Sequence, residues 1–387
     1  MDFNIIIDIF RLLDFESQLK MHKIFSKQCN LFEYVYELVA NNNMIDEQLM
    51  LYKNLRKLDC GNNKNFTNAC LRQLINLKKL DCGINTKFTD ISLSKLINLK
   101  KLDCGINTKF TDISLSKLIN LQSLNCYWNN NFTDTSLSKL TYLQELDCNY
   151  NGNFTDASLS KLNNLRVLYC GWCYGRFTDE SLSKLINLHS LDCGRNENFT
   201  DASLSKLTNL QVLHCGYNNN FTDEILSKLK KLRELDCYYS TKFTDASLSK
   251  LINLQTLNCG YNTNFTDASL NNLINLQVLH CCNANFTDDS LNKLINLKTL
   301  YSNKNFTDAS LSKLIELQTL CCCNNKNFTD SSLSKLINLH TLICGENKKF
   351  TNASLSNLTK LKNLYCERNK NFTEECFSKL PNLTVYK

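Results

Sequence analysis

The sequence predicts an α/β solenoid, in which every turn of a coiled chain adds one short parallel strand and one short helical turn. Three observations lead to this prediction. The pair Phe-Thr recurs fifteen times between Phe66 and Thr373, mostly 22 residues apart. Leucines recur at fixed places within each copy, and a cysteine follows them at one place. A fixed period of this length is typical of stacked repeats, because one unit cannot bury its own apolar face whereas neighbouring units share a continuous core.

The first half of the repeated unit predicts a strand followed by a turn. In the copy that reads LQSLNCYWNNNFTDTSLSKL, residues 121–140, Leu124 and Cys126 are apolar on either side of a polar residue. This alternation is expected of a short strand with one buried face. Asn129 follows where the chain must turn, and its amide can bond the backbone of the bend. We therefore expect one short strand and one asparagine turn in each copy.

The second half of the unit predicts a short helical turn on the outside of the coil. Phe132 returns the chain to the core, and Thr133 can cap the first turn of a helix. Asp134 is favourably placed in that turn, where the helix dipole stabilises a negative charge. Leu137 and Leu140 lie three residues apart and so point inward from the same helical face.

Most of the 21 cysteines follow the repeat. Fourteen occupy one place of the unit: Cys60, Cys82, Cys104, Cys126, Cys148, Cys170, Cys193, Cys215, Cys237, Cys259, Cys281, Cys322, Cys344 and Cys366. Ser302 fills the one place without a cysteine. A residue that is tied to a register and replaceable by serine is a small buried side chain, not half of a disulfide. We expect reduced thiols that stack about 4.8 Å apart in the interior.

The consensus of the unit is L-x-x-L-x-C-x-x-N-x-x-F-T-D-x-S-L-S-K-L-x-N. It resembles the leucine-rich repeat family, whose pattern is L-x-x-L-x-L-x-x-N/C-x-L; cysteine here replaces the third leucine and phenylalanine the fourth. The resemblance covers the chain from about Leu55 to its end. It implies an arc or horseshoe with about 15 short parallel strands on the concave face and short helical turns on the convex face. At the spacing of strands in a sheet, such a wall is roughly 65–70 Å long.

Residues 1–50 lie outside the repeat and predict a small helical head, so that the expected domains are 1–50 and 51–387. Apolar residues recur there at helical spacing, with a break around residues 14–17. The run Ile-Phe-x-x-Leu-Asp and the later Phe-Ser-Lys resemble an F-box, the helical module that binds a Skp1-type adaptor. In that family the apolar residues bury against the adaptor, which implies adaptor contacts by residues 1–40 through Ile6, Ile9, Phe10, Leu13, Leu19 and Phe25. The alternative is that the head only caps the exposed apolar end of the first coil, as every solenoid requires.

Copies of the repeat differ mainly at positions expected to face solvent, and we expect recognition to reside there. At the fifth position aspartates and asparagine give way to tyrosines and histidines, and both tryptophans of the chain stand at the eighth position. Exposed aromatic rings beside carboxylates suit a protein interface. The expected partner-binding stripe comprises Trp128, Asp147, Tyr150, Tyr169, Trp172, Asp192, His214, Tyr217, Asp236, Tyr239 and Tyr261. The alternative is that these rings pack sideways on their neighbours and only cover the edge of the sheet.

No constellation in the sequence indicates catalysis. The net charge of +7 comes without a concentrated basic run, and the inner positions are acidic, so we expect no nucleic-acid partner. Cys170 and Cys173 have redox-motif spacing, but Cys170 belongs to the inner column, and Cys173 replaces a turn asparagine. Zinc requires four convergent ligands, which no paired motif supplies. We therefore expect a non-enzyme without cofactor or metal. Without a secretory signal or an apolar run of about 20 residues, we also expect an intracellular protein outside the membrane.

Two hypotheses of function follow. The head-plus-repeat order is typical of substrate-recognition subunits of Skp1–cullin–F-box ubiquitin ligases, in which the concave face would hold a protein target. Alternatively, the chain is an interaction scaffold or inhibitor with no link to ubiquitin, and the head is a lid. The near-identical copies, rich in Asn and Lys, also resemble leucine-rich repeat families of large amoeba-infecting DNA viruses, which would place the protein in an infected host cell.

Overall fold

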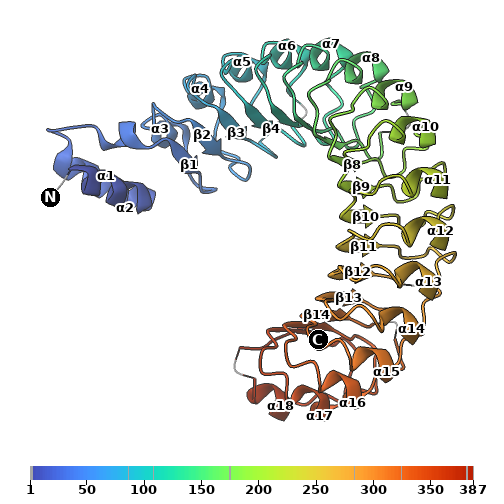
Figure 1. Cartoon of the computed structure of the whole chain (residues 1–387). Helices are drawn as coiled ribbons and strands as arrows, with labels where there is room; N and C mark the ends of the chain where they lie inside the picture. Colours follow the sequence, from blue (N-terminus) through green and yellow to red (C-terminus); the bar gives the residue numbers. More distant parts are fainter. Residues whose placement is uncertain are drawn as a thin grey trace. The chain divides into compact units, whose positions relative to one another are not determined.

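A computed structural model describes residues 3–85, 87–107, 109–173, 176–282, 284–323, 325–380 and 382–386. Met1 and Asp2 of the expected head therefore lie outside the described residues. The chain falls into two units, Met1–Asn187 and Leu188–Lys387. Each unit is a parallel solenoid in which short strands form one face and short helices the opposite face (Figure 1).

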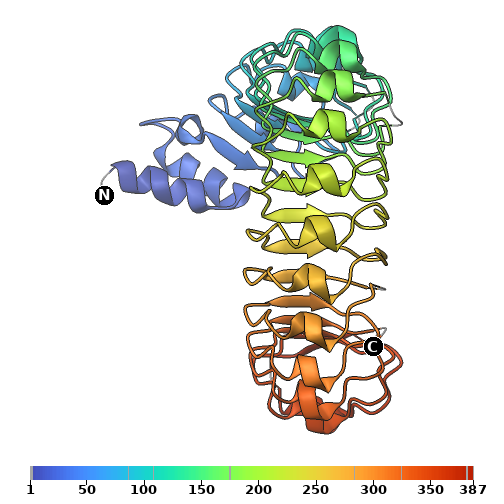
Figure 2. The same ribbon diagram turned by 45° about the vertical axis from the view of Figure 1, so that its right-hand side comes forward.

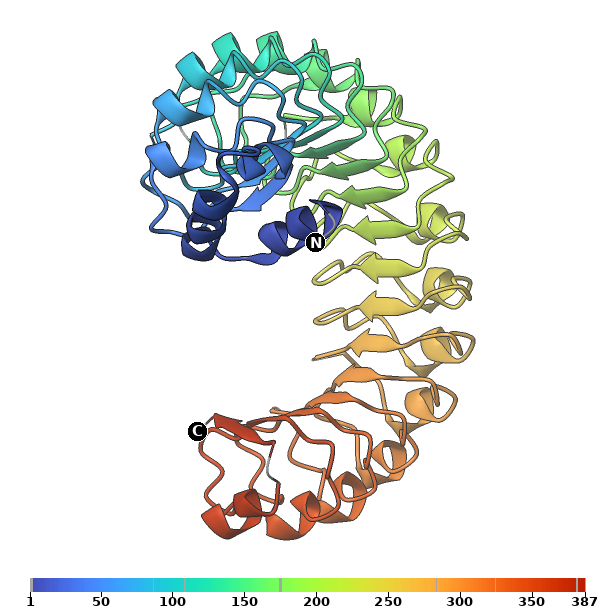
Figure 3. The same ribbon diagram turned by 90° about the vertical axis from the view of Figure 1, so that its left-hand side faces the viewer.

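The first unit opens with the expected helical head, drawn in dark blue in Figure 3. It consists of α1 (Phe3–Leu12), α2 (Phe15–Phe25) and the 3-10 helix η1 (Leu31–Tyr34). The break between the first two helices is at Asp14, whose side chain accepts a hydrogen bond from the backbone N–H of Ser17 at 2.8 Å and so caps the second helix.

The coils of the first unit follow the head. The strands are β1 (Glu37–Val39), β2 (Lys57–Asp59), β3 (Lys79–Asp81), β4 (Lys101–Asp103), β5 (Ser123–Asn125), β6 (Glu145–Asp147) and β7 (Val167–Tyr169). The outer helices are α3 (Asp46–Leu49), α4 (Asn68–Leu71), α5 (Asp90–Leu93), α6 (Asp112–Leu115), α7 (Asp134–Leu137), α8 (Asp156–Leu159) and α9 (Asp179–Leu182). Strands pair in parallel without a shift in register, so that equivalent residues of successive copies stand side by side, as Asp59, Asp81 and Asp103 do.

The second unit repeats the same arrangement, most visibly in the yellow and orange coils of Figure 2. Its strands are β8 (Ser190–Asp192), β9 (Val212–His214), β10 (Glu234–Asp236), β11 (Thr256–Asn258), β12 (Val278–His280), β13 (Thr299–Tyr301), β14 (Thr319–Cys321), β15 (Thr341–Ile343), β16 (Asn363–Tyr365) and β17 (Thr384–Tyr386). Its helices are α10 (Asp201–Leu204), α11 (Asp223–Leu226), α12 (Asp245–Leu248), α13 (Asp267–Leu270), α14 (Asp288–Leu291), α15 (Asp308–Leu311), α16 (Asp330–Leu333), α17 (Asn352–Leu355) and α18 (Glu374–Ser378).

The strands of the fifteen copies are β2–β16, and the sequence prediction of this architecture is confirmed. Two further strands flank them among the described residues. β1 pairs with β2, so the sheet begins within residues that the sequence assigned to the head. The short C-terminal strand β17 pairs with β16.

The interior consists of stacked leucine, phenylalanine and cysteine columns. Leu124, Cys126 and Phe132 are at most 1% exposed, and so are their equivalents in most copies. The cysteines are reduced thiols, and those of the inner column are buried, which confirms the prediction from their register. The thiol of Cys126 donates to the carbonyl of Asp147, 3.4 Å away in the next coil, so even these small side chains connect neighbouring copies.

The side chain of the turn asparagine forms hydrogen bonds both within its own coil and to a neighbouring coil. Asn151 is fully buried, and its amide nitrogen donates to the carbonyl oxygen of Asn129 at 2.6 Å. Its amide oxygen accepts from the backbone N–H of Asn153 at 2.9 Å. The expected turn is therefore confirmed, and it is also a link between neighbouring coils.

The outer helices α4–α18 each begin at a threonine, as expected, whereas α3 follows Ile45. In α7, for example, the Thr133 hydroxyl accepts from the backbone N–H of Thr135 at 3.2 Å. The aspartate that follows does more than favour the helix dipole. Asp134 accepts from the backbone N–H of Thr155 at 2.9 Å and from its hydroxyl at 2.5 Å. Ser158 of the same next coil also donates to this carboxylate. The cap of one helix is thus oriented by the carboxylate of the preceding coil.

Candidate functional site

The inner strand face of the first unit carries two parallel rows of opposite charge. Because side chains alternate along a strand, the residues on either side of the buried leucine share the exposed face. Lys57, Lys79 and Lys101 form one row and Asp59, Asp81 and Asp103 the other. Burial, together with the neighbouring carboxylates of Asp103 and Asp59, raises the pKa of Asp81 to about 6.

The charge rows end where β5–β7 begin, and a shallow recess of about 340 Å³ follows. It is lined by Asn125, Glu145, Asp147 and Tyr169 together with strand residues between them. Asn125 donates to the Asp103 carboxylate at 3.0 Å, and Lys101 forms a 3.5 Å ion pair with Glu145. Tyr169 is 36% exposed at the edge of this recess. This face therefore offers carboxylates, an amide and one aromatic ring to a partner.

A column of stacked aromatic rings lies at the turns of the same unit. Tyr150 stacks on Trp172 with ring centroids 5.4 Å apart and meets Trp128 edge-on at 5.5 Å. Tyr127, at the preceding position of its copy, contacts both Trp128 and Tyr150. Trp128 is 51% exposed. The rings therefore cover their neighbours and still present one side to solvent.

The second unit carries an equivalent column at the same position of its copies. Tyr239 stacks on Tyr217 at 5.1 Å and on Tyr261 at 4.5 Å, with nearly parallel planes. Tyr238 meets all three rings edge-on. The Arg195 guanidinium lies 4.1 Å from the centroid of Tyr217, a cation–π contact that extends the column by one coil.

The residues of both columns adopt a backbone conformation that bulky side chains seldom take. The φ angles are positive, between 57° and 61°, for Trp128, Tyr150, Trp172, Arg195, Tyr217, Tyr239 and Tyr261. This left-handed region costs an L-residue roughly 1–2 kcal/mol. It turns the backbone N–H toward the next coil, where that of Tyr217 meets the carbonyl of Tyr238 at 2.8 Å. The hydrogen bonds and ring stacking together hold the strained turns.

The inner strand face of the second unit is less charged. His214 Nε2 lies 2.8 Å from a carboxylate oxygen of Glu234 in the next strand. Asn258 donates to the Asp236 carboxylate at 2.8 Å. Burial raises the pKa of Asp192, opposed by the backbone N–H of Gly194 and by His214. His214 and Asp236 thus each have an ordered polar neighbour within the unit.

The predicted stripe therefore falls into two distinct features in each unit. Asp147, Tyr169, Asp192, His214 and Asp236 stand on the strands, whereas the other six predicted residues stand in the aromatic columns. All are half-buried or exposed. The prediction omitted Tyr127 and Tyr238. Both stand at the seventh position of their copies, directly before a predicted ring or column residue, and this placement could have indicated them. The positive φ angles could not be predicted from the sequence, because tryptophan, tyrosine and arginine do not favour such angles.

The residues expected to contact an adaptor are divided between the interior and the surface of the head. Phe10 is fully buried and Ile6 is 6% exposed, whereas Ile9 is 38% exposed. Leu13, Leu19 and Phe25 are half-buried.

The head is anchored to the first coil by an aromatic cluster and a polar bridge. Phe32 meets Phe10 at 5.1 Å and Tyr52 at 4.9 Å, both edge-on. The Tyr52 hydroxyl donates to the amide oxygen of Gln18 at 2.6 Å, and the amide nitrogen of Gln18 donates to the carbonyl of Phe10 at 2.9 Å. Ile6 and Phe10 therefore face the interior of the chain itself.

The cysteines outside the column differ in burial. Cys173 is fully buried and donates to the carbonyl of Cys148 at 3.1 Å, in the place of a turn asparagine. Cys282, Cys321 and Cys323 are half-buried. Within the described ranges, no group of three or more His, Cys, Asp or Glu side chains is arranged to hold a metal ion. Among the helices of those ranges, none has the length and apolar character that a membrane crossing requires.

Comparison with known proteins identifies the fold. No protein-family profile and no curated protein matches the chain. A leucine-rich repeat protein of Leptospira interrogans is similar in structure, with a TM-score of 0.58, 23% identity, and coverage of 88% of this chain and 92% of that one. The functional domain of InlJ from Listeria monocytogenes, which includes a cysteine ladder, has a TM-score of 0.51 and 24% identity, with coverage of 87% of this chain and 68% of that one. TLR13 in complex with ssRNA has a TM-score of 0.53 and 22% identity, with coverage of 91% of this chain and 57% of the TLR13 chain. The chain therefore has the fold of a leucine-rich repeat solenoid.

Proposed function

We propose that the chain is a protein-interaction scaffold, and that the aromatic columns with their adjoining strand faces are its contact surfaces. The observation that carries this proposal is the exposure of ordered aromatic rings: Trp128 is 51% exposed, and Trp172 and Tyr217 are each 36% exposed. Large rings held in one conformation are favourable contact residues, because they bury much area and lose little conformational freedom on binding.

The strand faces beside the columns suggest the chemistry of the partner. In the first unit the recess contains Asp147 and Glu145, and in the second unit Asp236 lies on the strand face. A partner segment that places basic or amide side chains against these carboxylates and an apolar side chain against the rings would match both features. We therefore infer a protein partner with a basic or polar segment.

Affinity capture with the intact chain tests this proposal. The bait variant Trp128→Ala/Tyr217→Ala removes one exposed ring from each unit, and the variant Ile97→Ala/Ile252→Ala removes exposed apolar side chains from the outer turns as a matched control. We expect a specific protein to be retained by the wild type and the control and lost with the ring variant. Equal retention by the ring variant would contradict the proposal.

A second candidate function is that of a substrate-recognition subunit of a Skp1–cullin–F-box ubiquitin ligase, with the head as the adaptor-binding module. The observation that favours it is the apolar character of both sides of α1. Ile6, Ile7 and Phe10 are buried, whereas Ile5 is 50% exposed and Leu12 is 87% exposed. Since Ile5, Ile9 and Leu12 recur at helical spacing, they form one exposed apolar stripe that an adaptor could cover.

Titration with a purified Skp1-type adaptor tests this candidate. We expect a complex at micromolar concentration that is weakened by Ile9→Asp/Leu12→Asp and unaffected by Ile97→Asp/Ile119→Asp, which introduces the same two charges at exposed positions of the outer turns. No complex with the wild type would reject the candidate and leave the head as a cap of the first coil.

We also infer an intracellular location. Stacked thiols that are kept reduced suit a reducing compartment. Fractionation of the cells that produce the protein tests this inference, and recovery of the chain only from the medium would contradict it.

A further inference from the structure

A column of lysines is confined to the last coils of the second unit. Lys304, Lys326, Lys348 and Lys370 each follow the buried turn asparagine of successive copies. The equivalent residues of three earlier copies of this unit, Asn219, Thr241 and Thr263, are uncharged. The lysine column is therefore a local feature and not part of the repeat pattern.

The backbone beneath the column holds these lysines in register. The amide nitrogen of Asn347 donates to the carbonyl of Asn325 at 3.0 Å, and that of Asn369 donates to the carbonyl of Asn347 at 2.7 Å. Successive lysines are thus one coil apart, about 4.8 Å. All four side chains are exposed. Two ammonium groups about 5 Å apart in water repel by about 0.8 kcal/mol, so the column favours the arrival of an anion.

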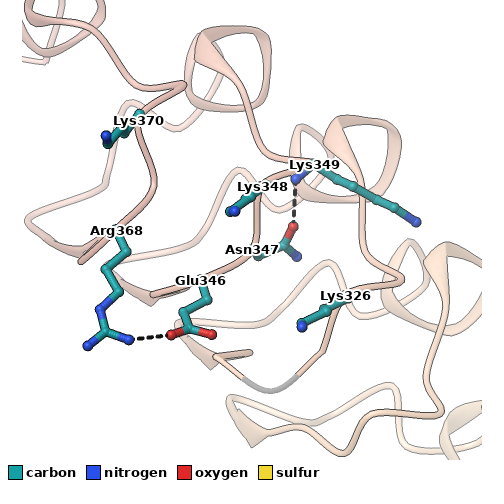
Figure 4. Close-up of a pocket in the computed structure, with 7 residues that line it drawn as sticks. All are labelled: Lys326, Glu346, Asn347, Lys348, Lys349, Arg368 and Lys370. Atoms are coloured by element: carbon teal, nitrogen blue, oxygen red, sulfur yellow. Dashed lines mark hydrogen bonds and ion pairs between the residues drawn. The ribbon is translucent and has the colours of Figure 1, made fainter.

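The charges around the column are not balanced within the chain. Arg368 forms a 2.7 Å ion pair with Glu346, the one carboxylate among the residues drawn in Figure 4. The ion pairs found among the described residues include none of the four lysines. The net charge of the cluster therefore remains strongly positive.

A pocket of about 560 Å³ lies at this cluster, lined by Lys326, Lys348 and Lys370 together with Glu346, Arg368 and their neighbours. The Lys349 side chain points away from the other cations in Figure 4, so it does not add to the inward-facing charge. Four cations and one carboxylate leave a net charge of +3 at the pocket. A volume of this size is typical of a site for a small molecule.

We propose that this pocket binds a compact oligophosphate, that is, a short chain of linked phosphates, free or as part of a nucleotide. A terminal phosphate carries a charge of about −1.5 to −2 and three strong acceptor oxygens. Linked phosphates therefore place several negative charges within the length of three coils. Lysine arms are flexible point charges that can follow such a ligand, as lysines do in other phosphate sites.

Two other polyanions fit this site less well. Carboxylates on one side of an extended acidic peptide repeat about every 6.6–6.8 Å, which does not match a column spaced at about 4.8 Å. Single-stranded nucleic acid is held by aromatic platforms on which bases stack, and the residues that line this pocket are Lys, Arg, Glu and Asn. The geometry thus favours the small phosphate ligand.

Isothermal titration calorimetry of the full chain with inorganic tripolyphosphate tests the proposal. The variant Lys326→Gln/Lys348→Gln/Lys370→Gln removes the column. The control Lys95→Gln/Lys117→Gln/Lys139→Gln removes three exposed lysines that are also one coil apart, on the outer turns of the first unit. Because the glutamines relieve repulsion, the column variant should melt no lower than the wild type without ligand, and a thermal scan verifies that it is folded.

We expect tripolyphosphate to bind the wild type and the control with the same affinity and to raise the melting temperature of both. The column variant should bind tripolyphosphate at least about tenfold more weakly. Affinity should fall between 50 and 300 mM NaCl, since exposed charges are screened. Equal affinity for a nucleoside triphosphate identifies the phosphate chain alone as the ligand, and higher affinity identifies a nucleotide. No binding at low salt, equal loss in the control, or tighter binding of an oligoglutamate peptide or a single-stranded oligonucleotide would overturn the proposal.

Discussion

Replacement of Tyr150 separates the two forces that act on the aromatic column of the first unit. Its ring contacts Trp172, Trp128 and Tyr127 at centroid distances of 5.4, 5.5 and 5.5 Å, and its φ angle is 59°. Removal of the ring should destabilise the chain by roughly 2–3 kcal/mol, since each ring pair contributes about 0.5–1.5 kcal/mol. The backbone strain remains in an alanine variant and disappears in a glycine variant.

The two variants should therefore differ in an unusual direction. Alanine at this position retains a left-handed cost of about 1–2 kcal/mol. Glycine avoids that cost and loses about 0.5–1 kcal/mol through the greater freedom of its unfolded chain. We expect Tyr150→Gly to be more stable than Tyr150→Ala by about 0.5–1 kcal/mol.

Tyr169 supplies the matched control, because it is the last residue of strand β7 and its backbone is extended. There the usual order should hold, with Tyr169→Ala more stable than Tyr169→Gly. Urea unfolding followed by circular dichroism measures all four variants, compared by midpoint because a repeat array need not unfold in one step. If Tyr150→Ala proved as stable as Tyr150→Gly, the strained turn would not be the reason for the order, and the reasoning would fail.

Three further predictions concern titratable groups and thiols. Burial and two neighbouring carboxylates raise the pKa of Asp81 to about 6 from 3.8, so its ionisation opposes folding above that pH. Asp81→Asn should therefore raise the melting temperature at pH 7.5, by the equivalent of about 1 kcal/mol after solvent screening, and leave it unchanged at pH 4. Equal shifts of the melting temperature at both pH values would contradict the assignment. Burial alone would raise the pKa of Asp308, but hydrogen bonds from Ser332 and Thr329 hold it below 3.8. Its contribution to stability is therefore fully present well above pH 3.8 and is lost as pH falls through the lower folded value. Asp308→Ala should lower the unfolding midpoint clearly at pH 7 and progressively less as the pH falls below 4, with Asp289→Ala on an exposed face as the control. Thiol labelling of the native chain should modify only the half-buried Cys29, Cys282, Cys321 and Cys323, and rapid reaction of column thiols such as Cys126 before unfolding would disprove their burial.

The features that the sequence could predict are those decided within one coil. The alternation around Leu124, the turn at Asn129 and the cap at Thr133 depend on residues a few positions away, and the structure confirms each. Burial of the cysteines followed from their register, because a residue that always stands beside two core leucines has the same surroundings in every copy.

The features that could not be predicted depend on contacts between coils or between distant segments. Asp134 binds Thr155 of the next copy, and local helix rules do not describe such a contact. The left-handed turn at Tyr150 results from a backbone N–H that reaches Gly171 at 3.3 Å, not from any preference of tyrosine. In the head, helical spacing predicted the helices correctly but not the burial of Phe10, which depends on Phe32, 22 residues further along the chain.

The turn asparagine has a consequence for how such an array can change during evolution. Since Asn347 and its equivalents fix the bend with buried bonds to the preceding coil, the exposed residue that follows each of them is less constrained by the fold. Across copies of the second unit the residues at this following position accordingly include asparagine, threonine and lysine. A duplicated coil would therefore fold as its neighbours do, while its exposed residues could change and acquire a binding specificity of their own.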